Sequence, residues 1–153
     1  MEIEKKLAEL GLELPPPRKP LGTYVSFVQT GNLLYLAGAG PFDLAGSGTT
    51  GKVGDGVTVE VAYQRARTVA LGHISAMREA LGDLDRVHRF VKVLGMVNAA
   101  PDFTAHPKVI NGYSDLMVEI FGDKGRHARS AVGMGSLPGG ISVEVEAIVE
   151  VSG

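Results

Sequence analysis

The sequence contains no cysteine among its 153 residues. This absence excludes disulfide bonds, thiolate metal sites and a cysteine nucleophile, and it leaves the redox compartment of the protein open. Neither sign of charge dominates, because 15 Lys and Arg residues stand against 17 Asp and Glu residues. With a formal net charge of -2, the chain as a whole lacks the electrostatic footprint of a nucleic-acid-binding protein.

Long apolar runs are absent as well. No stretch of the sequence approaches the roughly 18 apolar residues that a membrane-spanning helix needs. Residues 1–6 read Met-Glu-Ile-Glu-Lys-Lys, which lacks the apolar region of a signal peptide. We therefore expect a cytoplasmic protein that has no membrane partner.

The composition is that of a globular protein, with 44% hydrophobic and 21% charged residues. A chain of this length can bury a substantial core in a single domain. Ile3, Leu7 and Leu10 recur at near-helical spacing, and Gly11 fits a helix stop. We expect a helical extension over residues 1–13, followed by one domain over residues 14–153.

Hydrophobic periodicity predicts two long helices and five strands in that domain. Steps of three and four residues indicate helices over residues 57–81 and 107–121. Valine-rich or alternating segments indicate strands over residues 24–29, 33–37, 87–97, 129–134 and 141–149, and a turn at residues 30–32 joins the first two as a hairpin. These elements predict an α+β fold with a single sheet and both helices on one face.

Two further patterns are interpreted as structural rather than functional. Residues 43–56 are rich in Gly, Thr and Ser and predict a loop; they include a sequence that resembles a phosphate-binding loop but has Val53 where Ser or Thr would bind Mg²⁺. The four histidines lack the spacing of a metal site, so we expect no metal. His73, on the first long helix, is interpreted as a polar residue with a hydrogen-bond partner.

An arginine and a carboxylate stand out in the last quarter of the chain. Residues 126–129 read Arg-His-Ala-Arg, a turn follows at residues 137–140, and the last strand alternates so that Glu144 lies on the face opposite Val143 and Val145. If the strands on either side of this turn pair with each other, Arg129 and Glu144 come close together.

Arg129 admits three interpretations: a surface cation, an ion pair with Glu144, or a fork that binds the carboxylate of a ligand. His127 lies two residues earlier, and the alternation of a strand places both on one face. Lys124 and Arg126 add charge that could bind RNA phosphate. No aromatic stacking platform accompanies them, so RNA is the weaker interpretation.

Several segments together resemble the RidA family, also called the YjgF or L-PSP endoribonuclease-like family. The resemblance covers about residues 14–151 and is strongest at the last two segments. The segments are Gly22-Thr23-Tyr24-Val25, Leu36-Ala37-Gly38, Gly51-Lys52-Val53-Gly54-Asp55, His127-Ala128-Arg129-Ser130 and Val143-Glu144-Val145-Glu146-Ala147-Ile148. It implies a chorismate mutase-like fold over residues 14–153.

The resemblance also implies a function. Family members form homotrimers with clefts between subunits, and typical members deaminate 2-imino or enamine acids with water and no cofactor. The resemblance implies that Arg129 holds the substrate carboxylate and that Glu144 positions the water. It further implies that Tyr24 lines the cleft and that Gly38 contributes its backbone.

The sequence departs from typical deaminating members at three positions. Ala37 stands where they have serine, Ile110 where they have asparagine, and Ala131 where they have cysteine. Asn111 follows directly and is a candidate replacement, although one residue along a helix turns the side chain by about 100°, which should aim it elsewhere. We therefore expect a divergent subgroup that keeps the arginine.

Three functions stay open at this point. The first is a hydrolase that deaminates imines, with Glu144 as the catalytic residue. The second is a trimeric protein that binds a small carboxylate metabolite without turnover. The third is the endoribonuclease or translation inhibitor of the older family name. The candidate substrate-binding residues are Arg129, Tyr24, Gly38, His127 and Asn111.

Overall fold

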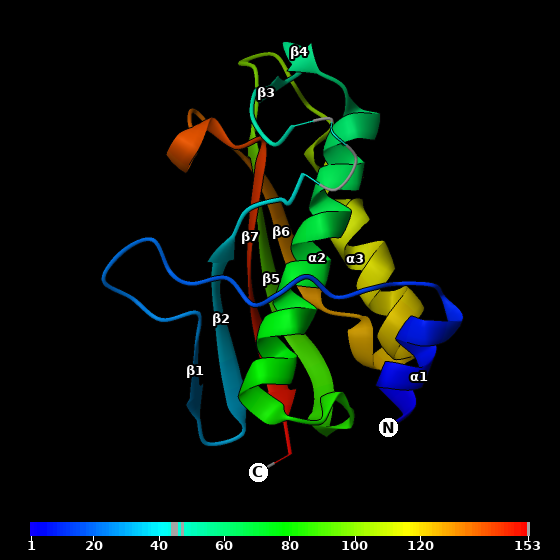
Figure 1. The fold of residues 1–153 in the computed structure, drawn as a ribbon. Coiled ribbons are helices and arrows are strands. Elements are labelled where there is room, and N and C mark those ends of the chain that lie inside the picture. Colours follow the sequence, from blue (N-terminus) through cyan, green and yellow to red (C-terminus); the bar gives the residue numbers. More distant parts are fainter. Residues whose placement is uncertain (44–45, 47, 153) are drawn as a thin grey trace.

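A five-stranded sheet with the strand order β1-β2-β7-β5-β6 forms the centre of the protein (Figure 1). The computed structural model describes residues 1–43, 46 and 48–152. The sheet contains β1 (Phe27–Thr30), β2 (Leu33–Ala39), β5 (Val87–Asn98), β6 (Ala128–Met134) and β7 (Val143–Val151). All pairings are antiparallel except β5 with β6, which is parallel.

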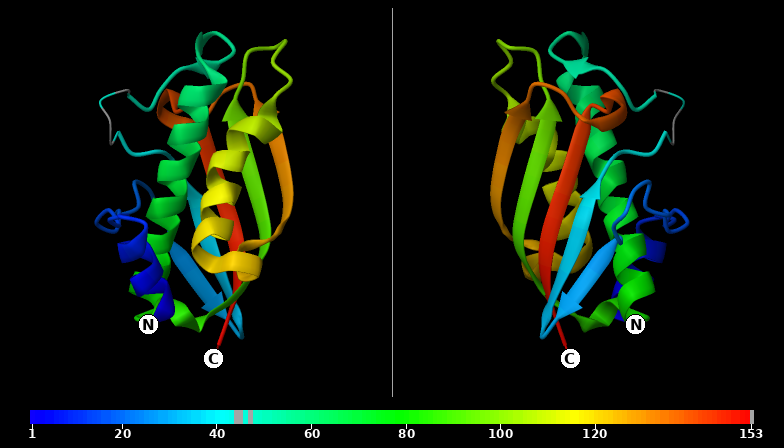
Figure 2. Two further views of the ribbon diagram at one scale, coloured as in Figure 1. Left: turned by 90° about the vertical axis from the view of Figure 1, so that its right-hand side faces the viewer. Right: turned by 90° about the vertical axis from the view of Figure 1, so that its left-hand side faces the viewer.

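Two long helices, α2 (Val59–Leu81) and α3 (His106–Phe121), pack on one face of this sheet, and no helix covers the other face in the described residues (Figure 2). The remaining elements are α1 (Glu2–Glu9), a separate two-stranded sheet of β3 (Lys52–Val53) and β4 (Gly56–Val57), and the 3-10 helices η1 (Leu84–Arg86), η2 (Gly122–Gly125) and η3 (Pro138–Gly140). The predicted α+β architecture is confirmed. No helix in the described ranges combines the length and apolarity that crossing a membrane requires.

The alternation of β7 produces its two faces, as the sequence predicts. Val143, Val145 and Ala147 are buried under the helices, whereas Glu144 and Glu146 point to the uncovered face. The helices begin and end near the predicted residues. The Thr58 hydroxyl accepts a hydrogen bond from the amide of Val61 and so caps α2.

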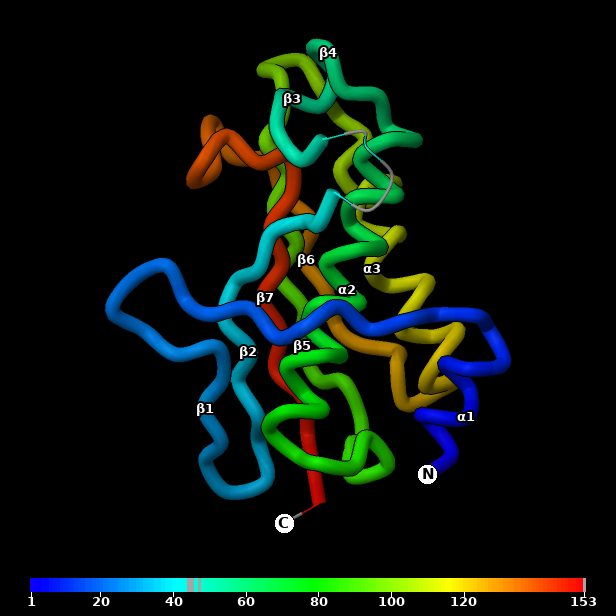
Figure 3. Tube along the Cα trace, in the orientation of Figure 1, coloured from blue at the N-terminus to red at the C-terminus, as the bar shows by residue number. Residues whose placement is uncertain are grey.

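The N-terminal extension forms a helix, as predicted. The carboxylate of Asp85 accepts hydrogen bonds from the amides of Glu2 and Ile3 at 2.7 and 2.9 Å, and these bonds lower the pKa of Asp85 to about 2. Leu7 is buried against the core. The following segment crosses α2 before it reaches β1 (Figure 3), and Ser75 donates to the Pro15 carbonyl there at 2.6 Å.

Two predicted elements need correction. The first strand begins at Phe27 rather than at residue 24, because the register with β2 ends at Phe27; before it, the Ser26 carbonyl still accepts a hydrogen bond from the Ala37 amide at 2.9 Å. Residues 43–56, predicted as a loop, include β3 and the first residue of β4, which pairs with β3. Residues 44, 45 and 47 of that segment lie outside the described residues.

Gly112 allows α3 to approach α2 closely. A Cβ atom at this position would collide with the backbone carbonyl of Tyr63 on α2. We expect Gly112→Ala to lower the free energy of unfolding by about 1–3 kcal/mol, because the clash involves backbone that cannot rotate away. Urea unfolding followed by circular dichroism measures the change.

Gly135→Ala is the matched control, since nothing lies within 4 Å of a Cβ built there. Its unfolding free energy should stay within about 0.5 kcal/mol of the parent. A Gly112→Ala protein as stable as the Gly135→Ala protein would show that the two helices can separate without cost.

Candidate functional site

The six residues predicted for the site fall into two groups in the structure. Arg129 and its neighbours lie between α3 and the edge strand β6. Tyr24, Gly38 and Glu144 line a pocket on the other side of the protomer. Arg129 and the other members of its group are absent from the lining of that pocket.

Arg129 is held on one side only. Its Nη1 atom donates to Asn111 Oδ1 at 2.8 Å and to Ser114 Oγ at 3.0 Å. These two acceptors lie three residues apart and therefore on one face of α3. Asn111 thus reaches Arg129, so the expectation that the turn of the helix aims it elsewhere is wrong.

His127 holds Ser114, the second acceptor of Arg129, in place. Its Nδ1 lies 2.7 Å from the carbonyl oxygen of Gly125, and its Nε2 lies 2.8 Å from Ser114 Oγ. Because a carbonyl only accepts, Nδ1 carries the hydrogen and the Ser114 hydroxyl donates to Nε2. Ser114 Oγ is then free to accept from Arg129. Burial lowers the pKa of His127, the Gly125 bond opposes this shift and the Arg129 charge adds to it, so the neutral ring fits its partners.

The other edge of the Arg129 guanidinium has no partner among the described residues. Within the described residues, no hydrogen bond engages Nε or Nη2, and no carboxylate forms an ion pair with Arg129. Burial lowers the pKa of Arg129, while the charge of Asp115 opposes the shift. Nε and Nη2 together present the paired donors that match the two oxygens of a carboxylate.

The pocket that contains the second group has a volume of about 680 Å³. Gly38 on β2 faces the side chain of Glu144 on β7, and a Cβ at Gly38 would collide with the Glu144 carboxylate. Within the described part of the chain, no hydrogen bond or ion pair involves this carboxylate. Burial raises the pKa of Glu144, and the nearby charge of Glu146 raises it further. Tyr24 is 52% exposed at the pocket.

The predicted pairing of Arg129 with Glu144 is wrong. The strands on either side of residues 137–140 do not pair, because β5 lies between β6 and β7. Arg129 is in register with Val93, which is buried under the helices, whereas Glu144 is in register with Met96 on the uncovered face. The two side chains therefore belong to opposite faces of one sheet, and they do not form an ion pair.

The positions that depart from typical deaminating members are also explained. Ile110 is fully buried, and its side chain packs against Gly95 on β5. Ala37 lines the pocket beside Gly38 but has no polar side-chain atom. Ala131 packs against the core next to Arg129. These three positions add no donor to either group.

Two residues of the site were missed or left without a role by sequence reasoning. Ser114 joins Arg129 to His127, and its position three residues after Asn111 was the available signal. Arg18 contributes to the pocket wall, where it donates to the Pro41 carbonyl at 2.8 Å and stacks on Phe42. Across the described residues, no group of three or more His, Asp or Glu residues could hold a metal ion.

His73, interpreted from sequence as a polar residue with a hydrogen-bond partner, is buried and has two partners: Ala37 and Tyr113. Burial lowers its pKa to about 4 from the ordinary 6.5. Below pH 6.5 the unfolded chain therefore takes up a proton that the folded chain does not. We expect acid to lower the free energy of unfolding by about 3 kcal/mol between pH 6.5 and 4 through His73.

Urea unfolding at pH 7.5, 5.5 and 4.5 measures this loss. Carboxylates also titrate in this range, so the comparison is with a double variant, His73→Leu/Tyr113→Phe, which removes both buried polar groups. The double variant should show a shallower fall in unfolding free energy. The same pH slope in both proteins would mean that His73 is not responsible.

The antiparallel-rich sheet with two long helices on one face makes this an α+β protein, and it carries two separate groups of candidate site residues. Comparison with known proteins identifies the family. The family described as “YjgF/chorismate mutase-like, putative endoribonuclease” matches residues 4–143. The chain belongs to this family, which contains the RidA proteins.

Relatives differ in how closely they match. Protein TCP17 of Trypanosoma cruzi is 44% identical over 151 residues, which are 98% of this chain and 94% of that protein. The crystal structure of Atu1372 from Agrobacterium tumefaciens is 42% identical with a TM-score of 0.89, over 99% of this chain and 94% of that one. RidA from an Antarctic Psychrobacter is 25% identical with a TM-score of 0.58, over 89% and 94% of the two chains. The difference between the two scores fits the predicted divergent subgroup.

Proposed function

We propose that this protein binds small 2-oxo or 2-imino acids, with the ligand carboxylate held by Arg129. The main observation behind the proposal is that the Arg129 guanidinium is hydrogen-bonded at one nitrogen only among the described residues. Its Nη1 is fixed by Asn111 and Ser114, while its Nε and Nη2 have no partner among the described residues. A partly desolvated cation with a free fork favours a bidentate anion over water.

The ligand site needs two copies of the chain. Arg129 belongs to the helix-covered face at the sheet edge, whereas Glu144, Gly38 and Tyr24 belong to a pocket elsewhere on the same protomer. One small ligand cannot reach both groups within one protomer. A cleft in which Arg129 of one copy faces Glu144 of another brings them together, as the family resemblance implies.

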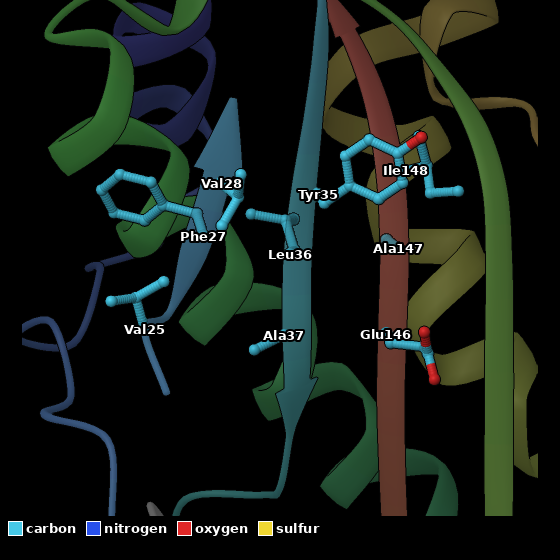
Figure 4. Close-up of a pocket in the computed structure, with 9 residues that line it drawn as sticks. All are labelled: Val25, Phe27, Val28, Tyr35, Leu36, Ala37, Glu146, Ala147 and Ile148. Atoms are coloured by element: carbon cyan, nitrogen blue, oxygen red, sulfur yellow. The ribbon is translucent and has the colours of Figure 1, made fainter. Parts of the chain in front are cut away.

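The uncovered face of the sheet supports such an assembly. It exposes apolar side chains, and a shallow depression of about 290 Å³ lies over β1, β2 and β7. Figure 4 shows Tyr35 reaching across β7 toward Ile148 in front of this depression. Val28, Tyr35 and Val132 are 53%, 42% and 38% exposed. A face of this kind usually marks an interaction site, and we propose that it is buried in a homotrimer.

Light scattering at micromolar concentration tests the assembly. We expect a mass three times the 16.1 kDa of the chain. Tyr35→Glu should yield monomers, because it places a charge in the proposed interface. The control Lys5→Glu, on exposed α1, should remain a trimer. A monomer mass for the parent protein would contradict the proposed homotrimer.

The reaction that this site could perform is imine hydrolysis without a cofactor. With the ligand carboxylate bound to Arg129, the imine carbon lies near a water molecule. Glu144 accepts a proton from this water. The water oxygen bonds to that carbon, the electron pair of the C=N π bond goes to the nitrogen, and the nitrogen takes up the proton that Glu144 accepted. The hydroxyl of the resulting carbinolamine then gives its proton, through Glu144, to the amino nitrogen. The carbon–nitrogen bond breaks as the carbon–oxygen double bond forms, and ammonia and a 2-oxo acid leave. The raised pKa of Glu144 brings this base closer to neutral pH.

Binding without turnover is the second candidate, and one observation favours it. Ala37 has no hydroxyl, and Ile110 is buried against Gly95, so two donors of typical deaminating members are missing. A protein that captures 2-oxo acids needs only the Arg129 fork. Isothermal titration with 2-oxobutanoate, alongside an imine assay, separates capture from catalysis.

The endoribonuclease interpretation has less support. The guanidinium of Arg126 lies 3.4 Å from the carboxylate of Asp123, and the partners of His127 fit a neutral ring. Among the described residues of 124–129, Lys124 and the free edge of Arg129 are then the cationic groups left to contact RNA phosphate, and no aromatic platform accompanies them. Binding to RNA that falls steeply with added salt would revive this interpretation. A cytoplasmic location is part of our proposal, and cell fractionation tests it.

A further inference from the structure

A buried histidine lies directly beneath the peptide that leads into Gly38. His73 on α2 is 2% exposed. Its Nε2 lies 3.0 Å from the carbonyl oxygen of Ala37, and its Nδ1 lies 2.7 Å from the hydroxyl of Tyr113 on α3. The imidazole thus connects both long helices to the end of β2.

These partners determine the tautomer of His73. The Ala37 carbonyl only accepts, so Nε2 carries the hydrogen and donates it. Nδ1 is then an acceptor, and the Tyr113 hydroxyl donates to it. The ring is neutral, and each of its nitrogens has a partner suited to that state.

The contact occurs where the sheet ladder is interrupted. Leu36 pairs with Ala147 and Ala39 with Val145, so β2 has one more residue than β7 between these pairs. Ala37 and Gly38 have no partner in this register. At such a bulge the backbone leaves the ladder and a local group can be aimed elsewhere. His73 supplies the bond that the Ala37 carbonyl lacks from the ladder.

Anchoring this carbonyl also directs the amide that follows it. The chain has no cis peptide bonds, and in a trans peptide the C=O and N–H point in opposite directions. Because the Ala37 oxygen points to α2, the Gly38 N–H points away from the helices. That is the side on which the Glu144 carboxylate packs over Gly38.

We propose that His73 is a positioning residue that holds the Ala37–Gly38 peptide so that the Gly38 N–H donates to the C2 oxygen of a bound 2-oxo acid. This inference rests on the proposed function, in which Glu144 and Gly38 face the ligand. The N–H is a donor that needs no side chain, so it is present although Ala37 has no hydroxyl. A donor fixed in advance binds more strongly than one that must be reoriented.

The test compares Tyr113→Phe with the double variant His73→Leu/Tyr113→Phe. His73→Leu alone would leave the Tyr113 hydroxyl buried without an acceptor, whereas the pair of changes removes both polar groups together. Tyr113→Phe keeps the donor to Ala37, and the double variant lacks it. We expect the dissociation constant for 2-oxobutanoate to rise about tenfold from the first to the second.

Two further measurements distinguish a positioning role of His73 from a merely structural one: the affinity of a conservative variant and the NMR signal of the Gly38 amide. His73→Gln places an amide donor near the Ala37 oxygen, and it should bind within about threefold of the parent protein. In ¹⁵N-labelled protein, the Gly38 amide proton should shift on ligand addition in Tyr113→Phe but not in the double variant. Equal affinity in these two proteins would overturn the proposal.

A crystal structure of the double variant without ligand makes the inference independent of the proposed function. We expect the Ala37–Gly38 peptide to rotate away from α2 once its anchor is gone. If the parent protein fails to bind any 2-oxo acid, the proposed function is wrong, and a rotated peptide would still establish His73 as its anchor. An unrotated peptide would overturn the role of His73 whatever the ligand measurements show.

Discussion

Arg129→Ala should weaken the binding of 2-oxobutanoate by about 2–5 kcal/mol, which is roughly 30-fold to several thousand-fold in the dissociation constant. The free edge of the guanidinium is the only fork that the proposal assigns to the ligand carboxylate. Its removal leaves a carboxylate in a partly buried cleft without a counter-charge. Isothermal titration calorimetry of the folded variant measures the loss.

Two further variants control for charge and for folding. Arg129→Lys should restore little of the affinity, because an ammonium lacks the fork. Arg126→Ala removes a nearby positive charge that is paired with Asp123 on the surface, and it should bind nearly as the parent does. An Arg129→Ala protein that folds and keeps its affinity would show that Arg129 serves to attach β6 to α3.

Turnover of ordinary 2-imino acids should be at least tenfold slower than in a conventional RidA protein. Each missing oxyanion-type donor can cost roughly 10²–10³ in rate, and here the side chains of Ala37 and Ile110 supply none. The measurement uses imines generated in place by an amino-acid oxidase, with both proteins assayed side by side.

Ala37→Ser tests the cause of the slow turnover, because it adds a hydroxyl in the pocket at the position where typical members have one. We expect it to raise the rate of imine hydrolysis above that of the parent. Ala8→Ser, which adds a hydroxyl on the exposed surface of α1 and away from both groups of site residues, is the matched control and should not raise it. A parent rate within tenfold of the conventional RidA protein would overturn the prediction.

The local elements followed from the sequence because their signals are local. Steps of three and four residues predicted α2 and α3 almost to their ends, and alternation predicted both faces of β7. The strand order did not follow. A hairpin between β6 and β7 is the shortest connection, but β5 pairs with both strands and separates them. That choice depends on contacts between distant segments, which periodicity does not encode.

The candidate site divides in the same way. The residue types were identified by resemblance, and Arg129, Asn111 and His127 do lie in one cluster. The role of Ser114 depends on how α3 packs beside β6, and no spacing rule includes both elements. Likewise, the opposite faces of Arg129 and Glu144 follow only from register combined with strand order. The proposed site between copies rests on that geometry together with the family resemblance, and the strand pattern alone does not predict it.

A crystal structure of the protein soaked with 2-oxobutanoate tests the central proposal most directly. The account predicts a trimer with the ligand carboxylate bound to Nε and Nη2 of Arg129 in one copy. It also predicts that the C2 carbon lies beside Glu144 and the Gly38 amide of the neighbouring copy. A ligand bound within a single copy and away from Arg129, or a clear trimer cleft that stays empty at saturating ligand, would contradict it.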